Sequence, residues 1–355
     1  MPTSREIYFF IYFVGTAVLA YLVTDLVARI ASRLGIHDVP DRGRKIHEYP
    51  LPKLGGVAIF ISFLVALMAL ALNGWTSEIS PWRLAGLVIA GLVLIFGGAL
   101  DDKYDLAPGV QICFPVAAAV LAVLSGTHIS YITNPLGGNI VLDQLKIGSY
   151  PVLGGLLVFG WILGLTYTTK FLDGMDGLVA GIAAIAAMVV FGLSLSREVN
   201  QTTTAFVALV FAAACFGFLP FNFHPARIFL GEGGSTLAGF VIATLAVISG
   251  GKIATALLVL GIPILDAAWV IVRRLWVGKS PFVGDKKHLH FRLLDIGLTQ
   301  RQSVMFLYLL AAIFGFVAVF LQSLGKLIAL GILSAVMLIV AIAVAVLYRK
   351  RAQSK

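Results

Sequence analysis

Two short acidic motifs have the residue types and spacing to bind a divalent cation or to share a proton. Asp101 and Asp102 are adjacent, and Asp105 follows about one helical turn later. Asp173 and Asp176 are three residues apart, a spacing that places both carboxylates on one helix face. Because neighbouring carboxylates repel each other, a bound cation or a shared proton usually relieves the repulsion. A solvated acidic loop for the first motif and an ordinary Asp-Gly turn for the second are the alternatives.

A glycine-rich segment could bind a diphosphate. The run Gly231-Glu-Gly-Gly-Ser235 is expected to open a helix, and the backbone N–H groups at a helix N-terminus attract anions. Glu232 could hold the metal that accompanies such a ligand. Asp266 lies inside an apolar stretch, where a charged residue is a functional candidate; pairing with an arginine is the alternative.

Two histidines, His288 and His290, alternate in a basic loop. They could ligate a transition metal, but no thiolate and no third histidine lies nearby in the sequence. The surrounding basic residues instead favour phosphate binding; they are Arg273, Arg274, Lys279, Lys286, Lys287 and Arg292. Cys113 and Cys215 stand in apolar runs without disulfide or metal spacing, so we expect both to be packing residues.

The elements that must position these residues are membrane helices. Of the 355 residues, 59% are hydrophobic and 12% charged, which excludes a water-soluble protein. The composition predicts an all-α polytopic membrane protein that forms a single domain, residues 1–355, without internal repeats. We expect about eleven transmembrane helices, at 7–31, 54–73, 84–100, 108–125, 152–172, 177–195, 203–219, 235–249, 253–275, 303–322 and 327–348. The segment at about 126–151 is expected to form a small hairpin outside the membrane.

The distribution of basic residues predicts the orientation. Of the 26 Lys and Arg residues, 20 fall on the side that holds the loop 32–53, and the remaining six fall on the other side. The positive-inside rule therefore places the N-terminus outside and the C-terminus in the cytoplasm. The net charge of +9 thus reflects topology and predicts no nucleic acid partner. Thirteen of the 17 carboxylates share the cytoplasmic side, which the topology rule does not explain and which points to a functional site there.

The motifs taken together resemble a known family, the polyprenyl-phosphate N-acetylhexosamine-1-phosphate transferases. The resemblance runs through nearly the whole chain in order, and its details look most like the branch that transfers GlcNAc-1-phosphate. The matching motifs are Arg44-Lys-x-His47, Pro50-x-Pro-x-x-Gly-Gly56, Asp101-Asp-x-x-Asp105, Asp173-Gly-x-Asp-Gly-Leu-x-x-Gly181, Asn222-x-x-Pro-Ala-x-x-Phe-x-Gly231, and Gly278-Lys-Ser-Pro-Phe282 through His288-x-His290.

The resemblance implies transfer of N-acetylhexosamine-1-phosphate from a UDP-sugar to a polyprenyl phosphate of the undecaprenyl type, with release of UMP, as the first membrane step of a cell-envelope glycan pathway. It implies a multi-pass protein of the cytoplasmic membrane whose active site faces the cytoplasm. The implied cofactor is Mg²⁺, or alternatively Mn²⁺. A second copy of the chain is a candidate partner. By the same resemblance Asp101 and Asp102 are catalytic, and Glu232 and Asp102 bind the metal. The substrate-binding residues it implies are Lys45, His47, Asp173, Asp176, Asn222, Phe229, Arg274, His288 and His290.

Four positions depart from the pattern of the family. Lys170 stands where the family usually has Asn, Glu232 where it has Asp, and Gly233 where it has Thr; Phe291 replaces a third histidine of the GlcNAc branch. Glutamate keeps the carboxylate but adds a methylene, and Lys170 brings a cation into the nucleotide pocket. We expect either a different donor sugar or a retuned site.

Two other functions fit part of the sequence. An intramembrane prenyltransferase could use Asp101-Asp-x-x-Asp105 to bind a prenyl diphosphate through Mg²⁺, but the second Asp-rich motif is a poor one and the histidine loop would be unexplained. A transporter or non-catalytic scaffold is the alternative from another class. Charges confined to one surface, away from the bilayer midplane, argue against transport.

Overall fold

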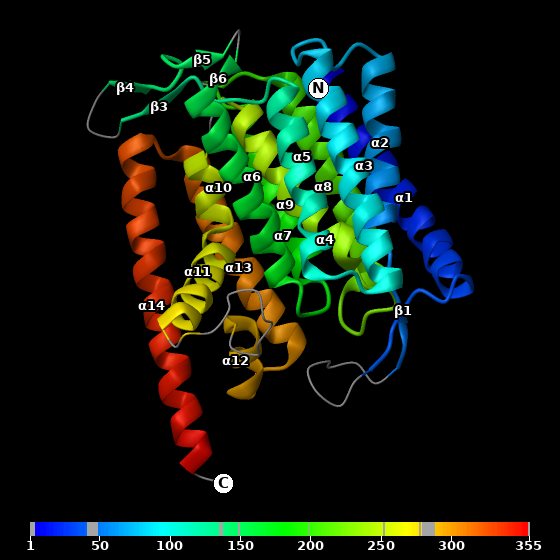
Figure 1. Ribbon diagram of the computed structural model, residues 1–355, viewed down its shortest axis with the longest axis vertical. Coiled ribbons are helices and arrows are strands. Elements are labelled where there is room, and N and C mark those ends of the chain that lie inside the picture. Colours follow the sequence, from blue (N-terminus) through cyan, green and yellow to red (C-terminus); the bar gives the residue numbers. More distant parts are fainter. Residues whose placement is uncertain are drawn as a thin grey trace.

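The computed structural model describes residues 4–40, 49–134, 138–147, 150–197, 199–250, 253–276, 278 and 288–353. Most of them are helical, and the long helices stand side by side in one bundle (Figure 1). The all-α class and the polytopic membrane architecture are thereby confirmed. Both follow from the sequence, because a backbone in lipid must satisfy its hydrogen bonds internally.

The described part of the chain forms fourteen helices. The first group is α1 (Ser4–Arg33), α2 (Gly55–Leu72), α3 (Pro81–Tyr104), α4 (Pro108–Gln111), α5 (Cys113–Leu124), α6 (Val152–Leu172) and α7 (Leu178–Ser194). The second group is α8 (Thr202–Asn222), α9 (Gly231–Ile248), α10 (Ile253–Val259), α11 (Gly261–Trp276), α12 (Leu289–Asp295), α13 (Gln300–Phe320) and α14 (Ser323–Gln353).

Eight of the described helices are long and apolar enough to cross a membrane. The pair α10 and α11, bent by 79° at Leu260, adds a ninth if it is one span. Helices occupy the two remaining predicted ranges as well, but Pro108–Leu124 and Leu178–Ser194 are shorter. A helix of 17 residues such as α7 is only about 26 Å long against a hydrocarbon core of about 30 Å. The total of eleven crossings therefore stays a prediction.

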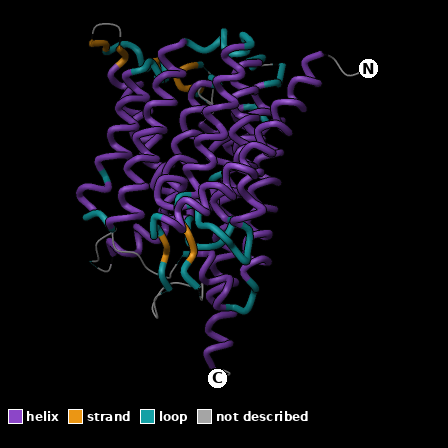
Figure 2. The backbone as a smooth tube through the Cα atoms, turned by 90° about the vertical axis from the view of Figure 1, so that its right-hand side faces the viewer, coloured by secondary structure: helices purple, strands orange, loops and turns teal. Residues whose placement is uncertain are grey.

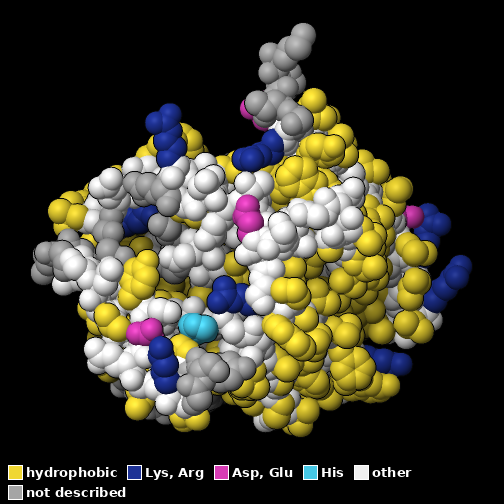
Figure 3. All heavy atoms as spheres, turned by 90° about the horizontal axis from the view of Figure 1, so that it is seen from above, with side chains coloured by type: hydrophobic (Ala, Val, Ile, Leu, Met, Phe, Trp, Pro, Cys, Tyr) yellow, Lys and Arg dark blue, Asp and Glu magenta, His cyan; other side chains and the backbone are white. Residues whose placement is uncertain are grey.

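Helices α8 and α9 form the centre of the bundle, and α1 and α14 lie at its edge. The side chains of α8 and α9 are almost all buried, whereas α1 and α14 expose many apolar side chains. Seen from the side, the helices run in nearly one direction (Figure 2). Viewed from the end that bears the N-terminus, hydrophobic side chains cover much of the rim (Figure 3). An apolar rim around a packed centre suits a protein whose solvent is lipid.

Glycines bring the first turn of α9 against two other helices. A Cβ atom added to Gly98 of α3 would lie 2.1 Å from the backbone nitrogen of Gly233, and one added to Gly56 of α2 would lie 2.2 Å from the Cα of Gly234. Such contacts allow only glycine. The backbone of α9 is therefore held directly against α2 and α3, which places Glu232 beside Asp102.

Three two-stranded antiparallel sheets lie at the two ends of the bundle. The pair β1 (His37–Asp38) and β2 (Leu51–Pro52) lies at the end that holds the C-terminus, and the other strands lie at the opposite end with the N-terminus (Figure 1). The predicted hairpin at about 126–151 is confirmed as β3 (Tyr131–Thr133) and β4 (Asn139–Val141), with Ile132 opposite Ile140. A second hairpin, β5 (Lys146–Ile147) and β6 (Tyr150–Pro151), completes the segment.

Candidate active site

One cavity of about 610 Å³ collects most of the predicted site residues. It is formed by the end of α3, the α6–α7 turn, the loop from α8 to α9 and the first turn of α9, together with residues near β2. The predicted residues that line it are Asp101, Asp102, Asp173, Asp176, Asn222, Phe229 and Glu232. These residues come from four separate motifs, so the fold brings together what the sequence spreads over about 130 positions.

Asp102 contacts a lysine and a backbone N–H group. Its Oδ2 accepts a hydrogen bond of 3.1 Å from the backbone nitrogen of Glu232, and its Oδ1 lies 3.5 Å from the Nζ of Lys53. Lys53 also lies 3.3 Å from Asp38. The ammonium is partly desolvated, but the two carboxylates outweigh that effect and raise the pKa of Lys53. Lys53 therefore stays charged beside Asp102.

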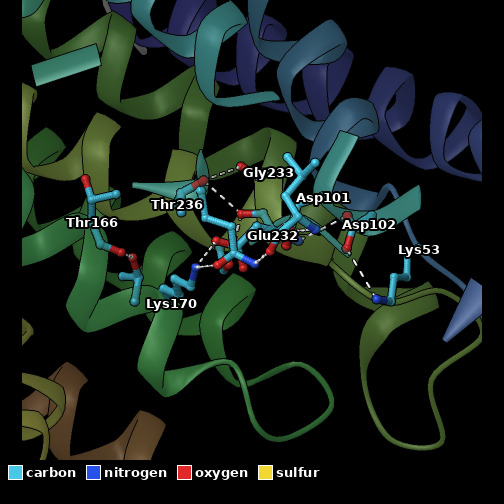
Figure 4. Close-up of polar contacts among 12 residues, drawn as sticks. Lys53, Asp101, Asp102, Thr166, Lys170, Glu232, Gly233 and Thr236 are labelled. Carbon is cyan, nitrogen blue, oxygen red and sulfur yellow. Dashed lines mark hydrogen bonds and ion pairs between the residues drawn. The ribbon is translucent and has the colours of Figure 1, made fainter. Parts of the chain in front are cut away.

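Glu232 is paired with a second lysine. Its Oε1 lies 2.5 Å from the Nζ of Lys170, which also donates to the Oε1 of Gln111 over 3.1 Å. Gln111 in turn donates to the Oδ1 of Asp101 over 2.8 Å. In Figure 4 the two lysines flank the group of carboxylates, Lys53 on one side and Lys170 on the other. A chain of polar contacts thus connects α9, α6 and α3.

Asp173 lies in the turn after α6, and its side chain is accessible from the cavity. The surrounding protein desolvates its carboxylate and the nearby carboxylates of Glu232, Asp102 and Asp176 repel its charge, so the pKa of Asp173 is raised. Water in the cavity moderates the desolvation but leaves the repulsion. An electropositive ligand in this cavity would be attracted by several charges at once.

Asp176 and Asn222 hold the backbone of the cavity wall. The Oδ2 of Asp176 accepts from the backbone nitrogen of Ala226 at 3.1 Å and lies 2.7 Å from the Nδ1 of His224. Asn222 accepts from the backbone nitrogen of Gly177 at 3.1 Å and donates to the carbonyl of Ile228 at 2.9 Å. Both side chains therefore shape the loop that carries Phe229.

The histidine motif forms a cluster with Asp266. The Nδ1 of His288 lies 2.9 Å from the Oδ2 of Asp266, whose Oδ1 accepts from the backbone nitrogen of Leu289 at 2.8 Å. His290 is buried against Gly174, and burial lowers its pKa to about 4, so the ring is neutral at pH 7. Neither of its ring nitrogens has a hydrogen-bond partner within the described part of the chain.

Some predicted residues do not line the cavity. His288, His290 and Arg274 are absent from its wall, although Phe291 reaches it. Lys45 and His47 lie outside the described residues. The assignment of all five of these residues to substrate binding stays a prediction.

Three residues of the site were missing from the sequence-based prediction: Lys53, Gln111 and His224. Each contacts a predicted carboxylate, as described above. The sequence gives only one signal for these three residues: each is a basic or amide side chain close to a site motif.

The carboxylate oxygens of Asp102 and Glu232 are of the kind that Mg²⁺ prefers. Asp102 and Glu232 supply hard oxygen ligands on adjacent backbone, and Mg²⁺ is commonly bound by one or two carboxylates together with substrate phosphates and water. Among the described residues, no group of three or more His, Cys, Asp or Glu side chains could hold a metal on its own. The residues therefore fit a cation that a diphosphate helps to bind.

The fold and the site together define a helical membrane protein with an acidic cavity at one end of the bundle. Residues 84–250 match the model of glycosyl transferase family 4. A probable undecaprenyl-phosphate N-acetylglucosaminyl 1-phosphate transferase of Bacillus subtilis is 32% identical over 332 residues, which cover 91% of this chain and 87% of that protein. A decaprenyl-phosphate N-acetylglucosaminephosphotransferase of Mycobacterium tuberculosis is 34% identical, covering 84% and 79% of the two chains.

A third relative, the undecaprenyl-phosphate alpha-N-acetylglucosaminyl 1-phosphate transferase of Salmonella typhimurium, is 30% identical over 83% of this chain and 78% of its own. The chain therefore belongs to the family of polyprenyl-phosphate N-acetylhexosamine-1-phosphate transferases. The resemblance drawn from the motifs is confirmed, and the chain is a multi-pass membrane transferase.

Proposed function

We propose that this chain transfers GlcNAc-1-phosphate from UDP-GlcNAc to a polyprenyl phosphate of the undecaprenyl type and releases UMP, as the first membrane step of a cell-envelope glycan pathway. The observation that carries the proposal is the single cavity lined by seven motif residues. The relatives whose names describe this transfer match 83% to 91% of the chain, and the family model matches residues 84–250, which include all seven of these residues. A soluble donor and a lipid acceptor can meet only at the membrane surface, and the cavity lies at one end of the bundle.

The reaction forms one phosphorus–oxygen bond and breaks another. An oxygen of the lipid phosphate attacks the β-phosphorus of the donor, and the bond from that phosphorus to the bridging oxygen breaks, so that UMP leaves with the electron pair. Asp101 and Asp102 orient or deprotonate the lipid phosphate. We assign the proton to Asp102, which faces the cavity between Lys53 and Glu232, because the Oδ1 of Asp101 is already engaged by Leu106 and Gln111.

The nucleotide end of the donor is assigned to the opposite side of the cavity. Phe229 offers an aromatic face on which uracil can stack, and Asp173 offers a carboxylate accessible to ligand. Asp176 and Asn222 position the loop that carries Phe229 through their bonds to Ala226 and Ile228. Lys45, His47, Arg274, His288 and His290 are proposed to bind phosphate or sugar.

Asp102 and Glu232 are the residues that would hold Mg²⁺, with Mn²⁺ as the alternative. Such an ion would supply positive charge that offsets the charge developing on the phosphates during transfer. Lys53 places one positive charge beside Asp102 whether or not a cation is bound.

For the orientation, we propose eleven crossings with the N-terminus outside, the C-terminus in the cytoplasm and the cavity open to the cytoplasm of the inner membrane. The termini lie at opposite ends of the bundle in Figure 1, as this arrangement requires. A homodimer is proposed on the family resemblance alone.

Incubation of the purified protein with radiolabelled UDP-GlcNAc and undecaprenyl phosphate tests the proposal. The expected products are lipid-linked GlcNAc-phosphate and UMP in equal amounts. Transfer of a prenyl group, or no turnover with any member of a UDP-sugar panel, would contradict it. The first result would favour a prenyltransferase and the second a transporter or scaffold.

A further inference from the structure

The ion pair between Lys170 and Glu232 is unusual for a carboxylate that is proposed to bind a cation. The Nζ of Lys170 lies 2.5 Å from the Oε1 of Glu232, and each side chain is only about one-fifth exposed. At this separation and in this partly desolvated setting the ammonium occupies one of the directions from which a metal ion would approach the carboxylate. Lys170 and a divalent cation therefore compete for the same oxygen.

Lys170 has a second acceptor in place. Its Nζ donates to Gln111 at 3.1 Å, and its aliphatic stem brings the ammonium within 5.8 Å of the centre of the Tyr167 ring. An ammonium that leaves Glu232 thus keeps two favourable contacts and is not stranded in a desolvated position. The cost of moving Lys170 off Glu232 is reduced, so the exchange with a cation can be reversible.

The other carboxylate proposed to bind the metal is paired more loosely. Lys53 lies 3.5 Å from Asp102 and divides its charge between Asp102 and Asp38. Lys170 has one carboxylate partner within ion-pair distance among the described residues. Glu232 is therefore the ligand whose availability is most strongly controlled by a lysine.

We propose that Lys170 is a positioning residue that acts through Glu232 and sets the affinity of the site for its divalent cation. This inference rests on the proposed function for the identity of the site. By neutralising Glu232 when no cation is bound, Lys170 weakens cation binding and makes it more dependent on the diphosphate of the donor. A neutral residue at this position should give a site that binds the cation tightly even without nucleotide.

Binding of Mn²⁺ alone to the purified protein, followed by electron paramagnetic resonance of the free ion, tests this directly. Lys170→Asn is expected to bind Mn²⁺ about tenfold more tightly than the wild type, because a competing charge-assisted hydrogen bond has been removed. Lys170→Arg keeps the charge and is expected to bind no more tightly than the wild type. Lys103→Asn serves as the matched control, because it removes an exposed lysine at the end of α3 that carries Asp102. Its Mn²⁺ affinity should equal that of the wild type.

A double-mutant cycle shows whether Lys170 acts through Glu232. In a Glu232→Gln background, Lys170→Asn is expected to change the Mn²⁺ affinity by less than about twofold. If Lys170→Asn fails to fold, Lys170→Gln replaces it and carries the same prediction. Unchanged or weaker Mn²⁺ binding in the neutral variant overturns the inference, as does full persistence of the effect without Glu232.

The proposed function is judged separately from this measurement. Absence of lipid-linked sugar from the wild-type reaction with every member of the UDP-sugar panel would refute the proposed transferase activity. Tighter Mn²⁺ binding by the neutral variant would still support the role of Lys170, since that experiment uses neither donor nor acceptor.

Discussion

Asp102 is the residue whose loss should cost the most activity. Its two oxygens face Lys53 and the backbone nitrogen of Glu232, so no other described carboxylate has the same position at the edge of the cavity. Asp102→Asn is expected to lower kcat by at least about 10²-fold, the lower range for losing a general base or a charge-orienting group. Radiolabelled transfer measures the rate, and binding of UDP-GlcNAc should persist.

Asp105→Asn provides the matched control for that variant. Asp105 belongs to the same acidic motif, but it is exposed, ends α3 in a left-handed conformation and does not line the cavity. Asparagine tolerates that conformation, so activity should stay near the wild-type level. A wild-type rate in Asp102→Asn would show that the Asp102 carboxylate has no catalytic role.

His290 makes a prediction about pH. Its pKa is lowered to about 4 in the folded chain, whereas the ordinary value is about 6.5. Between these two values the unfolded chain binds a proton that the folded chain does not, so stability falls as the pH is lowered. From pH 7 to pH 5 this group should remove about 2 kcal/mol from the free energy of unfolding.

Unfolding of the detergent-solubilised protein at both pH values measures the effect. His290→Gln removes the titrating group, so the loss of stability between pH 7 and pH 5 should be smaller in this variant by about that amount. An equal pH dependence in the two proteins would show that His290 is protonated, or solvated, in the folded state.

The acidic part of the candidate site was predictable at the scale of residues, whereas Lys53 and the pairing of the lysines with particular carboxylates were not. Asp101, Asp102, Asp173, Asp176 and Glu232 stand out because carboxylates are costly beside a membrane and need a reason to be there. Lysines beside a membrane need no such reason, since topology alone accounts for them. The pairing of Lys53 and Lys170 with particular carboxylates depends on how α3, α6 and α9 are packed, which one sequence does not specify.

At the scale of elements, the crossing of α3 and α9 should be intolerant of any side chain. A Cβ at Gly98 would meet the backbone of Gly233, which cannot move aside as a flexible side chain would. Gly98→Ala is expected to destabilise the protein by about 1–3 kcal/mol, the usual cost of overpacking. It should also lower activity, because it displaces Glu232 from Asp102.

Gly164→Ala in α6 is the control for this substitution. Nothing lies within 4 Å of a Cβ at that position, and alanine favours a helix over glycine. Its unfolding midpoint in detergent should equal or exceed that of the wild type. Equal stability of the two alanine variants would contradict the close approach of α3 to α9.

The elements themselves were predicted well where length and apolar character decide them. Every predicted span is occupied by helix, because an apolar run in lipid has few other ways to satisfy its backbone. The bend of 79° between α10 and α11 was not predicted. Gly261 and Pro263 stand at the bend and give a physical cause for it, but helices in membranes also tolerate such residues without bending.

For the whole molecule, turnover should depend on a divalent cation. The described cavity has several carboxylates and two nearby lysines, so a diphosphate entering it needs further positive charge. Excess EDTA is expected to abolish transfer, and Mg²⁺ is expected to restore it. Full activity in EDTA would mean that the two lysines supply enough positive charge for transfer without a divalent cation.

The orientation of the whole molecule can be tested by labelling single cysteines, because one end of the bundle is predicted to face the cytoplasm and the other end the outside. Lys103, at the end of α3, and Asn139, in β4, are exposed at opposite ends. In a background with Cys113 and Cys215 replaced by alanine, an impermeant maleimide added to intact cells should label Asn139→Cys and leave Lys103→Cys unlabelled. Inverted membrane vesicles should reverse the pattern.

The split of 20 basic residues against six predicts this outcome, since the positive-inside rule places the Lys103 end in the cytoplasm. Labelling of Lys103→Cys from outside would place the acidic cavity on the wrong side for a cytoplasmic donor.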